Sequence, residues 1–171
     1  RLLASSFFLI FVLQLFSQQS IQDRFMPPSG FVRQEQNSWG KYLRSLPLKP
    51  NGSPVLLYNG QTKANQVHAA VIDMDVGSKN LQQCADAVIR IRAEYLFAQR
   101  RFDDIHFNFT NGWRCDYSKW REGFRVEVKG NHTEWIRKAK YDDSYSAFRK
   151  YLEMVFMYAG TLSLSQELYS I

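Results

Sequence analysis

The chain has 171 residues, a length that suits one domain with a core of its own. Its two cysteines, Cys84 and Cys115, allow at most one disulfide, which excludes a disulfide-stapled scaffold. The formal net charge of +6 favours anionic partners such as envelope polymers or lipid head groups.

An apolar segment stands at the start of the chain. Leu2 to Phe16 is almost unbroken in apolar residues, follows Arg1 and gives way to polar residues at Ser17. Its 15 residues fall short of the roughly 20 that a membrane-spanning helix needs. We therefore expect residues 1–17 to be a secretory signal peptide, with a retained membrane anchor as the alternative. The expected location is the periplasm or outer cell envelope, with no nucleic-acid partner and membrane contact only through an uncleaved signal segment.

The next segment, 18–54, holds all five prolines and predicts an extended lead-in. Apolar residues at helical spacing predict one short helix within it, 38–46, which the following proline stops. A short strand is expected at 55–58, before a turn at Asn59 and Gly60. Residues 55–171 then carry the elements of the main domain.

A β-branched and apolar run, 66–76, predicts a central strand that ends at Gly77. The helix after it is expected to begin with Asn80 as N-cap and Gln83 at the third helical position, which places Cys84 about one turn inside. Arg90 and Glu94 would pair on its outer face. Its inward stripe is expected to hold Cys84, Val88, Ile91 and Tyr95.

Two later segments alternate between apolar and polar residues and predict half-buried strands. They are 104–110, with His106 and Asn108 on its polar face, and 124–129, and we expect the two to pair antiparallel. A helix is expected at 144–158 with Gly160 after its end, and a further helix from Ser163. The pattern predicts an α+β fold, a small and partly antiparallel sheet packed against two or three helices.

Cys84 is the residue best placed to act as a nucleophile, because a helix N-terminus favours the thiolate form of a cysteine. A nucleophilic cysteine needs a histidine base, and His106 is the best candidate in the chain since it lies on the polar face of a strand beside Asn108. Three other interpretations stay open: Cys84 as a buried structural thiol, Cys84 as half of a Cys84–Cys115 disulfide, and His106 as a solvent-facing strand residue.

Aromatic and basic residues gather between and around the two alternating segments. Trp113, Trp120 and Arg125 predict a platform for sugar rings, or else a set of rings that caps a small core. No histidine, cysteine or carboxylate spacing typical of a metal ligand set is present, so we expect no metal and no cofactor.

Four stretches of the chain resemble a known family: Leu46 to Pro50, Ala70 to Gly77, Leu81 to Leu96 with its Gln-Gln-Cys-Ala-Asp block, and Tyr158 to Leu164. The family is the one catalogued as domain of unknown function 4846. The resemblance runs from about Pro27 to Leu168. It implies an exported or lipid-anchored bacterial envelope protein with no established activity, and relatives that continue past the point matching Ile171 into a Gly-Asp-Val strand and a Gly-His-Ala-Val-like strand.

A helix-borne cysteine followed by a Gly-Asp strand and a Gly-His strand is similar to papain-like peptidoglycan amidases and endopeptidases. By that analogy the fold is an incomplete papain-like one, Cys84 is the nucleophile, and the base lies beyond this chain, which would be inactive as a fragment. The expected function is a thiol-dependent amidase or peptidase acting on cell-wall peptides in its full-length form. The alternative is a non-catalytic envelope module that binds glycan or a protein partner.

Overall fold

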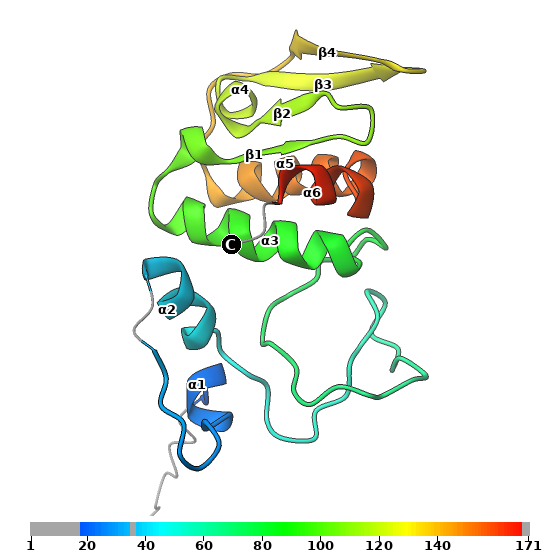
Figure 1. Cartoon of the computed structure of the whole chain (residues 1–171). Coiled ribbons are helices and arrows are strands. Elements are labelled where there is room, and N and C mark those ends of the chain that lie inside the picture. The colour runs from blue at the N-terminus through cyan, green and yellow to red at the C-terminus, as the bar shows by residue number, and fades with distance from the viewer. Residues whose placement is uncertain (1–17, 35–36, 169–171) are drawn as a thin grey trace, which may run out of the picture. The chain divides into compact units, whose positions relative to one another are not determined.

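The computed structural model describes residues 18–34 and 37–168. The expected signal peptide at residues 1–17 lies outside that range. The described residues combine α-helices with two small antiparallel sheets of two strands each, which confirms the α+β class (Figure 1). None of the helices in these ranges has the length and apolar character needed to cross a membrane.

The described chain forms two compact units. The first comprises the described residues up to Val55 together with Asn65–Met74, and it holds helices α1 (Ile21–Arg24) and α2 (Ser38–Ser45). The predicted helix at 38–46 is confirmed as α2, and the side chain of Asn37 caps it by accepting a 2.9 Å hydrogen bond from the Gly40 N–H.

The predicted central strand at 66–76 is wrong. That segment is extended but pairs only through a single bridge, between Ile72 and Leu48. A β-branched run becomes a strand only when a neighbouring strand supplies its hydrogen bonds, and the proline-rich lead-in offers one short stretch of backbone. The predicted strand at 55–58 is likewise reduced to one bridge, Leu56 to Thr62, around the Asn59-Gly60 turn.

The second unit comprises Leu56–Ala64 and the chain from Asp75 to Leu168. Its first helix, α3 (Cys84–Ala98), starts later than predicted, because Gln83 rather than Asn80 is the N-cap. The carboxylate of Asp86, at the third helical position, accepts a 2.9 Å hydrogen bond from the Gln83 N–H and completes one half of a capping box. Cys84 is therefore the first residue of the helix, after a loop rather than a strand.

The buried face of α3 is also rotated from the predicted stripe. Val88 is 49% exposed and Cys84 is exposed, whereas Ile89, Arg90 and Ala93 are buried. Tyr95 is buried as predicted. The Arg90–Glu94 pair forms as expected, with 2.6 Å between Nε and Oε1, but it lies on the inner face. Sequence periodicity assigns arginine to the surface, and here its hydrogen bonds outweigh that preference.

The strands form two separate hairpins. In the first, β1 (His106–Asn108) pairs with β2 (Arg114–Asp116), and in the second β3 (Phe124–Lys129) pairs with β4 (His132–Arg137). The predicted pairing of 104–110 with 124–129 is therefore wrong, because each strand pairs with its nearest neighbour across a tight glycine turn. The alternating burial of 104–110 is as predicted, with Ile105, Phe107 and Phe109 inside.

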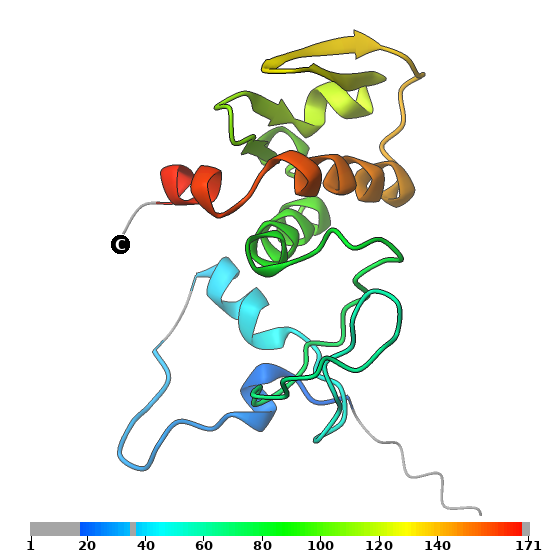
Figure 2. The ribbon, with the colours of Figure 1, turned by 90° about the vertical axis from the view of Figure 1, so that its right-hand side faces the viewer.

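Helix α5 (Tyr145–Tyr158) lies between α3 and the two hairpins in both views (Figures 1 and 2). The side chain of Ser144 caps its start by accepting a hydrogen bond from the Ala147 N–H, and Phe148, Tyr151, Leu152 and Val155 are fully buried. Phe97 of α3 stacks on Phe148 with ring centroids 4.3 Å apart. The short helices α4 (Tyr117–Arg121) and η1 (Phe102–Asp104), which the sequence did not predict, add Tyr117 and Phe102 to this aromatic core.

The last described helix, α6 (Thr161–Glu167), begins earlier than predicted. Gly160 follows the C-cap of α5, as predicted, and is also the N-cap of α6. Ser163 is the third residue of α6, and its Oγ accepts a 3.0 Å hydrogen bond from the Gly160 N–H. The α5–α6 junction is consequently short, and it brings the end of α5 and the start of α6 to the N-terminus of α3, where the same groove is lined by all three.

Gly123, between α4 and β3, has φ +99°. Its carbonyl accepts hydrogen bonds of 3.0 Å from the N–H groups of Lys138 and Ala139, so the backbone that follows β4 passes directly over it. A Cβ at this position would overlap the Ala139 carbonyl. Only glycine fits both the backbone angle and the space.

Candidate thiol groove

Cys84 lies in a surface groove of about 510 Å³. The thiol-bearing end of α3 forms one wall and the α5–α6 junction forms the other. Polar side chains in the groove come from Asn80, Gln83, Asp86 and Thr161, and apolar ones from Phe156 and Met157. Since Cys84 is exposed, the interpretation of this residue as a buried structural thiol is wrong.

A buried guanidinium holds the loop that leads into this groove. Arg90 is only 2% exposed, and its Nη1 lies 3.4 Å from both the Asp75 carbonyl and Oε1 of Gln82. Its Nη2 lies 3.2 Å from the hydroxyl of Tyr145, which itself donates a 2.8 Å hydrogen bond to Glu94. Arg90 thus ties loop 75–83 to α3 and α5, and so fixes where the helix and its cysteine begin.

Asp75 adds a second tie at the start of the same loop. Its carboxylate accepts 2.6 Å hydrogen bonds from Nη1 of Arg149 and from the Gly77 N–H. Partial burial opposes ionisation of this carboxyl, but the Gly77 and Arg149 hydrogen bonds outweigh it, and the pKa of Asp75 lies below its ordinary value. At neutral pH the tie is an ion pair.

Asp86 is the unusual polar group of the groove. Asp86 is 7% exposed. Its Oδ2 accepts a hydrogen bond from the Gln83 N–H, and its Oδ1 has no hydrogen-bond partner among the described residues. Burial raises the pKa of this carboxyl above its ordinary value, although the backbone hydrogen bonds lower it in part. The sequence signal for it was the Gln83–Asp86 spacing, which predicts a capping box once Gln83 is taken as the N-cap.

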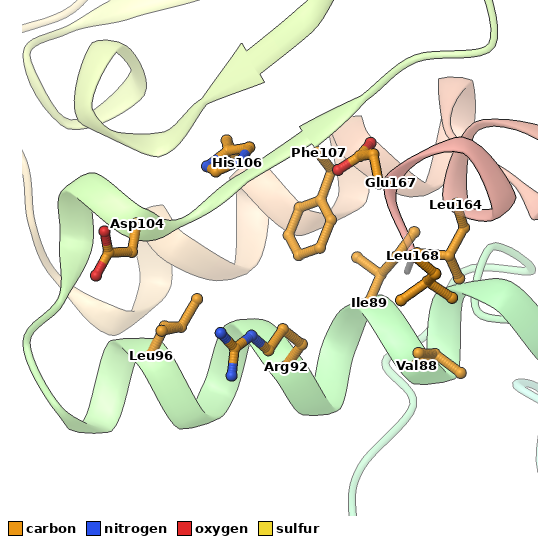
Figure 3. Close-up of a pocket in the computed structure, with 10 residues that line it drawn as sticks. All are labelled: Val88, Ile89, Arg92, Leu96, Asp104, His106, Phe107, Leu164, Glu167 and Leu168. Carbon is orange, nitrogen blue, oxygen red and sulfur yellow. The ribbon is translucent and has the colours of Figure 1, made fainter. Parts of the chain in front are cut away.

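His106, the predicted base, lines a different pocket of about 250 Å³. Figure 3 shows this pocket between α3 and β1, with Leu164 and Glu167 from α6 at one side and Phe107 pointing toward α3. The His106 Nδ1 is buried without a hydrogen-bond partner in the described part of the chain. The structure therefore does not bring Cys84 and His106 together in one pocket.

The other two histidines also lie outside the groove. His68 belongs to the first unit, where its Nε2 is 2.9 Å from the Ser53 carbonyl, and His132 is an exposed residue at the start of β4. Of the histidines in the described residues, none lines the Cys84 groove. Nor does any group of three or more histidine, cysteine or acidic residues there have the geometry of a metal site.

Cys115 is fully buried on β2 and has no disulfide partner, and neither has Cys84. The hydroxyl of Tyr151 donates a 2.8 Å hydrogen bond to the Cys115 carbonyl. Burial, reinforced by the charge of Asp116, raises the pKa of the Cys115 thiol far above its ordinary value. Cys115 is thus an inert core residue.

The predicted sugar platform is divided between two ring clusters. Trp120 is 5% exposed, and the Arg125 guanidinium covers its ring at 4.2 Å from the centroid while donating a 2.8 Å hydrogen bond to the Trp120 carbonyl. Trp113 is only partly buried and packs against Trp135, with ring centroids 5.0 Å apart. The Trp120–Arg125 pair therefore covers the core, whereas Trp113 and Trp135 present ring surface.

The arrangement defines an α+β protein with an accessible cysteine at a helix N-terminus. The chain belongs to the family described as domain of unknown function 4846, whose model matches residues 21–171. No curated protein and no solved structure matches the chain.

Proposed function

We propose that this chain carries the nucleophile of an exported, thiol-dependent amidase or peptidase that acts on cell-wall peptides. The observation that supports the proposal is the position of Cys84, exposed as the first residue of a 15-residue helix and facing a groove of about 510 Å³. A structural cysteine would be expected in the core, as Cys115 is.

The chemistry proposed for the groove is acyl transfer. The Cys84 thiolate attacks the carbonyl carbon of a substrate amide, a C–S bond forms, the C–N bond breaks, and the leaving amine takes a proton. Water then hydrolyses the thioester and returns the thiol. The first N–H groups of a helix have no acceptors within it, so those at the start of α3 suit the oxyanion of the tetrahedral intermediate.

A cysteine nucleophile of this kind also needs a general base. Because the described histidines lie outside the groove, we propose that the imidazole comes from chain outside the described residues, as the papain-like analogy implies. The net charge of +6 would assist by attracting an anionic envelope polymer to the protein.

The test uses the product of the complete gene with purified peptidoglycan, and follows the release of free amino groups. The wild-type protein should release them, and the Cys84→Ser variant should lose at least about a thousandfold in rate. Cys115→Ala is the matched control, since it removes the other thiol and should keep the activity. Equal rates for wild type and Cys84→Ser would end the proposal.

A second candidate is a non-catalytic envelope module that binds glycan. The contact of Trp113 with Trp135 favours it, because paired rings with exposed surface suit the apolar faces of sugars. Trp113→Ala would then weaken retention on a peptidoglycan column, and Cys84→Ser would leave retention unchanged.

A further inference from the structure

A short loop of the first unit, Phe25 to Arg33, is closed at its neck by a side chain. The Arg33 guanidinium donates hydrogen bonds to the carbonyls of Gln22, at 3.2 Å, and Phe25. At the tip, the Phe31 N–H donates a 3.0 Å hydrogen bond to the Pro28 carbonyl, and Gly30 supplies the positive φ of +83° that the turn needs. The loop is therefore a defined projection rather than an open strand of chain.

The side chains on this projection are apolar and unburied. Met26 is 74% exposed, Phe31 is 71% exposed and Val32 is 87% exposed. Single exposed apolar residues are common on protein surfaces, but three within one short closed loop are a local concentration, and such a concentration indicates a binding surface.

The arginines around the loop carry charge that no carboxylate in the described ranges neutralises. Arg24 donates to the side-chain oxygen of Gln19 and the Lys49 carbonyl, Arg33 to the two carbonyls of the neck, and Arg44 to the Gln34 carbonyl. All these acceptors are uncharged. The positive charge of these guanidinium groups is therefore not offset by an ion pair within the described ranges, and it attracts an anion.

We propose that this loop docks onto the surface of an anionic lipid bilayer. Met26, Phe31 and Val32 enter the boundary between head groups and acyl chains, and Arg24 and Arg33 stay at the level of the phosphates. A bilayer fits better than a protein, because a stable protein interface buries about 800 Å² on each partner, more than the tip of one short loop presents. The proposal is independent of the thiol chemistry.

The test places one reporter tryptophan on the loop and one away from it. Phe31→Trp puts an indole on the tip, and Val67→Trp puts one at a position of the same unit that is equally open, 84% exposed. The full chain is mixed with vesicles of phosphatidylcholine, with or without phosphatidylglycerol, whose acyl chains carry bromine. Subtracting the wild-type emission leaves the signal of the added indole, and any binding through residues 1–17 is common to both variants.

We expect the Phe31→Trp signal to fall by about twofold or more in vesicles that contain phosphatidylglycerol, and to fall less in phosphatidylcholine alone. The Val67→Trp signal should not change in either. Unchanged emission from Phe31→Trp in both lipids would overturn the proposal and leave a protein partner as the occupant. Equal loss from the two variants would overturn it as well, because the contact would then not be specific to the loop.

Discussion

At the scale of single residues, Cys84 and Cys115 differ in the property that governs thiol chemistry, which is access to reagent. Cys84 is exposed at the N-terminus of α3. Cys115 is 0% exposed, and its carbonyl accepts a hydrogen bond from the Tyr151 hydroxyl. Since only a thiolate in contact with solvent reacts, the two residues should separate cleanly in a labelling experiment.

We predict that iodoacetamide modifies Cys84 in the native protein at least about a thousandfold faster than Cys115, because Cys115 reacts only when the second unit unfolds. Mass spectrometry of the peptides after timed labelling measures both rates. In urea the two rates should become similar. Comparable labelling of Cys115 without denaturant would contradict the described core.

Asp86 gives the fold a specific pH dependence. Because burial raises the pKa of this carboxyl, the folded protein holds its proton to a higher pH than the unfolded chain does. Its contribution is most favourable below the unfolded pKa of about 4 and is lost as pH rises through the folded pKa. Asp86→Asn keeps an oxygen for the Gln83 N–H and does not titrate.

We therefore predict that, as pH rises above about 4, the unfolding free energy of Asp86→Asn increases relative to that of the wild type. Urea unfolding at a series of pH values measures the difference. A pH-independent difference for Asp86→Asn would contradict the raised pKa.

The sequence pattern predicted the burial of some of these side chains correctly and that of others wrongly. The alternation of Ile105, His106 and Phe107 predicted burial correctly, because apolar residues with period two leave one solution for a half-buried strand. Arg90 was assigned to the surface because its partners outside α3, Gln82 and Tyr145, come from two other segments of the chain. Such partnerships depend on tertiary structure, so local pattern does not reveal them.

At the scale of elements, the helices were easier to predict than the strand pairs. Helices α2 and α5 were found from the spacing of their apolar residues and from the proline or glycine that follows them in the sequence. Strand 124–129 was found too, but its partner β4 was missed. Four of the six residues in His132–Arg137 are charged or polar, so the segment shows no clear alternation of apolar and polar residues. The groove was missed for a related reason: it forms only where α3 meets the α5–α6 junction.

Gly123 offers the sharpest test of how these elements join. We predict that Gly123→Ala lowers the unfolding free energy by about 3 kcal/mol or more, because the new Cβ overlaps the Ala139 carbonyl and φ is +99°. Gly130→Ala, in the turn of the second hairpin, also has a positive φ but nothing within 4 Å, and should cost only about 1 kcal/mol. Urea unfolding of the two variants compares them, and equal losses would contradict the close packing at Gly123.

At the scale of the whole molecule, the two units differ in how many apolar side chains each of them buries. In the first unit, the buried apolar side chains among the described residues are Leu46 and Leu48. The second unit contains the aromatic core around α5, with Phe148, Tyr151 and Tyr117 at 0% exposure. Since apolar burial supplies most of the favourable free energy, the first unit should open at lower cost.

We predict that the backbone amides of α2 exchange with deuterium at least about a hundredfold faster than those of α5. The reason is that the hydrogen bonds of α2 are backed by no buried residue of its own, whereas five residues of α5 are buried. Peptide-resolved hydrogen exchange at neutral pH measures both. Equal protection would mean that the two units unfold as one.

The difference in exposure between Cys84 and Cys115 also determines how the purified protein oxidises in air. Oxidation cannot close a bridge inside the molecule, because Cys115 is sealed in the core, and so Cys84 is left to pair with the same residue of a second copy. Storage without a reductant should therefore accumulate a covalent dimer that is linked through the Cys84 residues of its two grooves. A fresh reductant is then a condition for any assay of this groove.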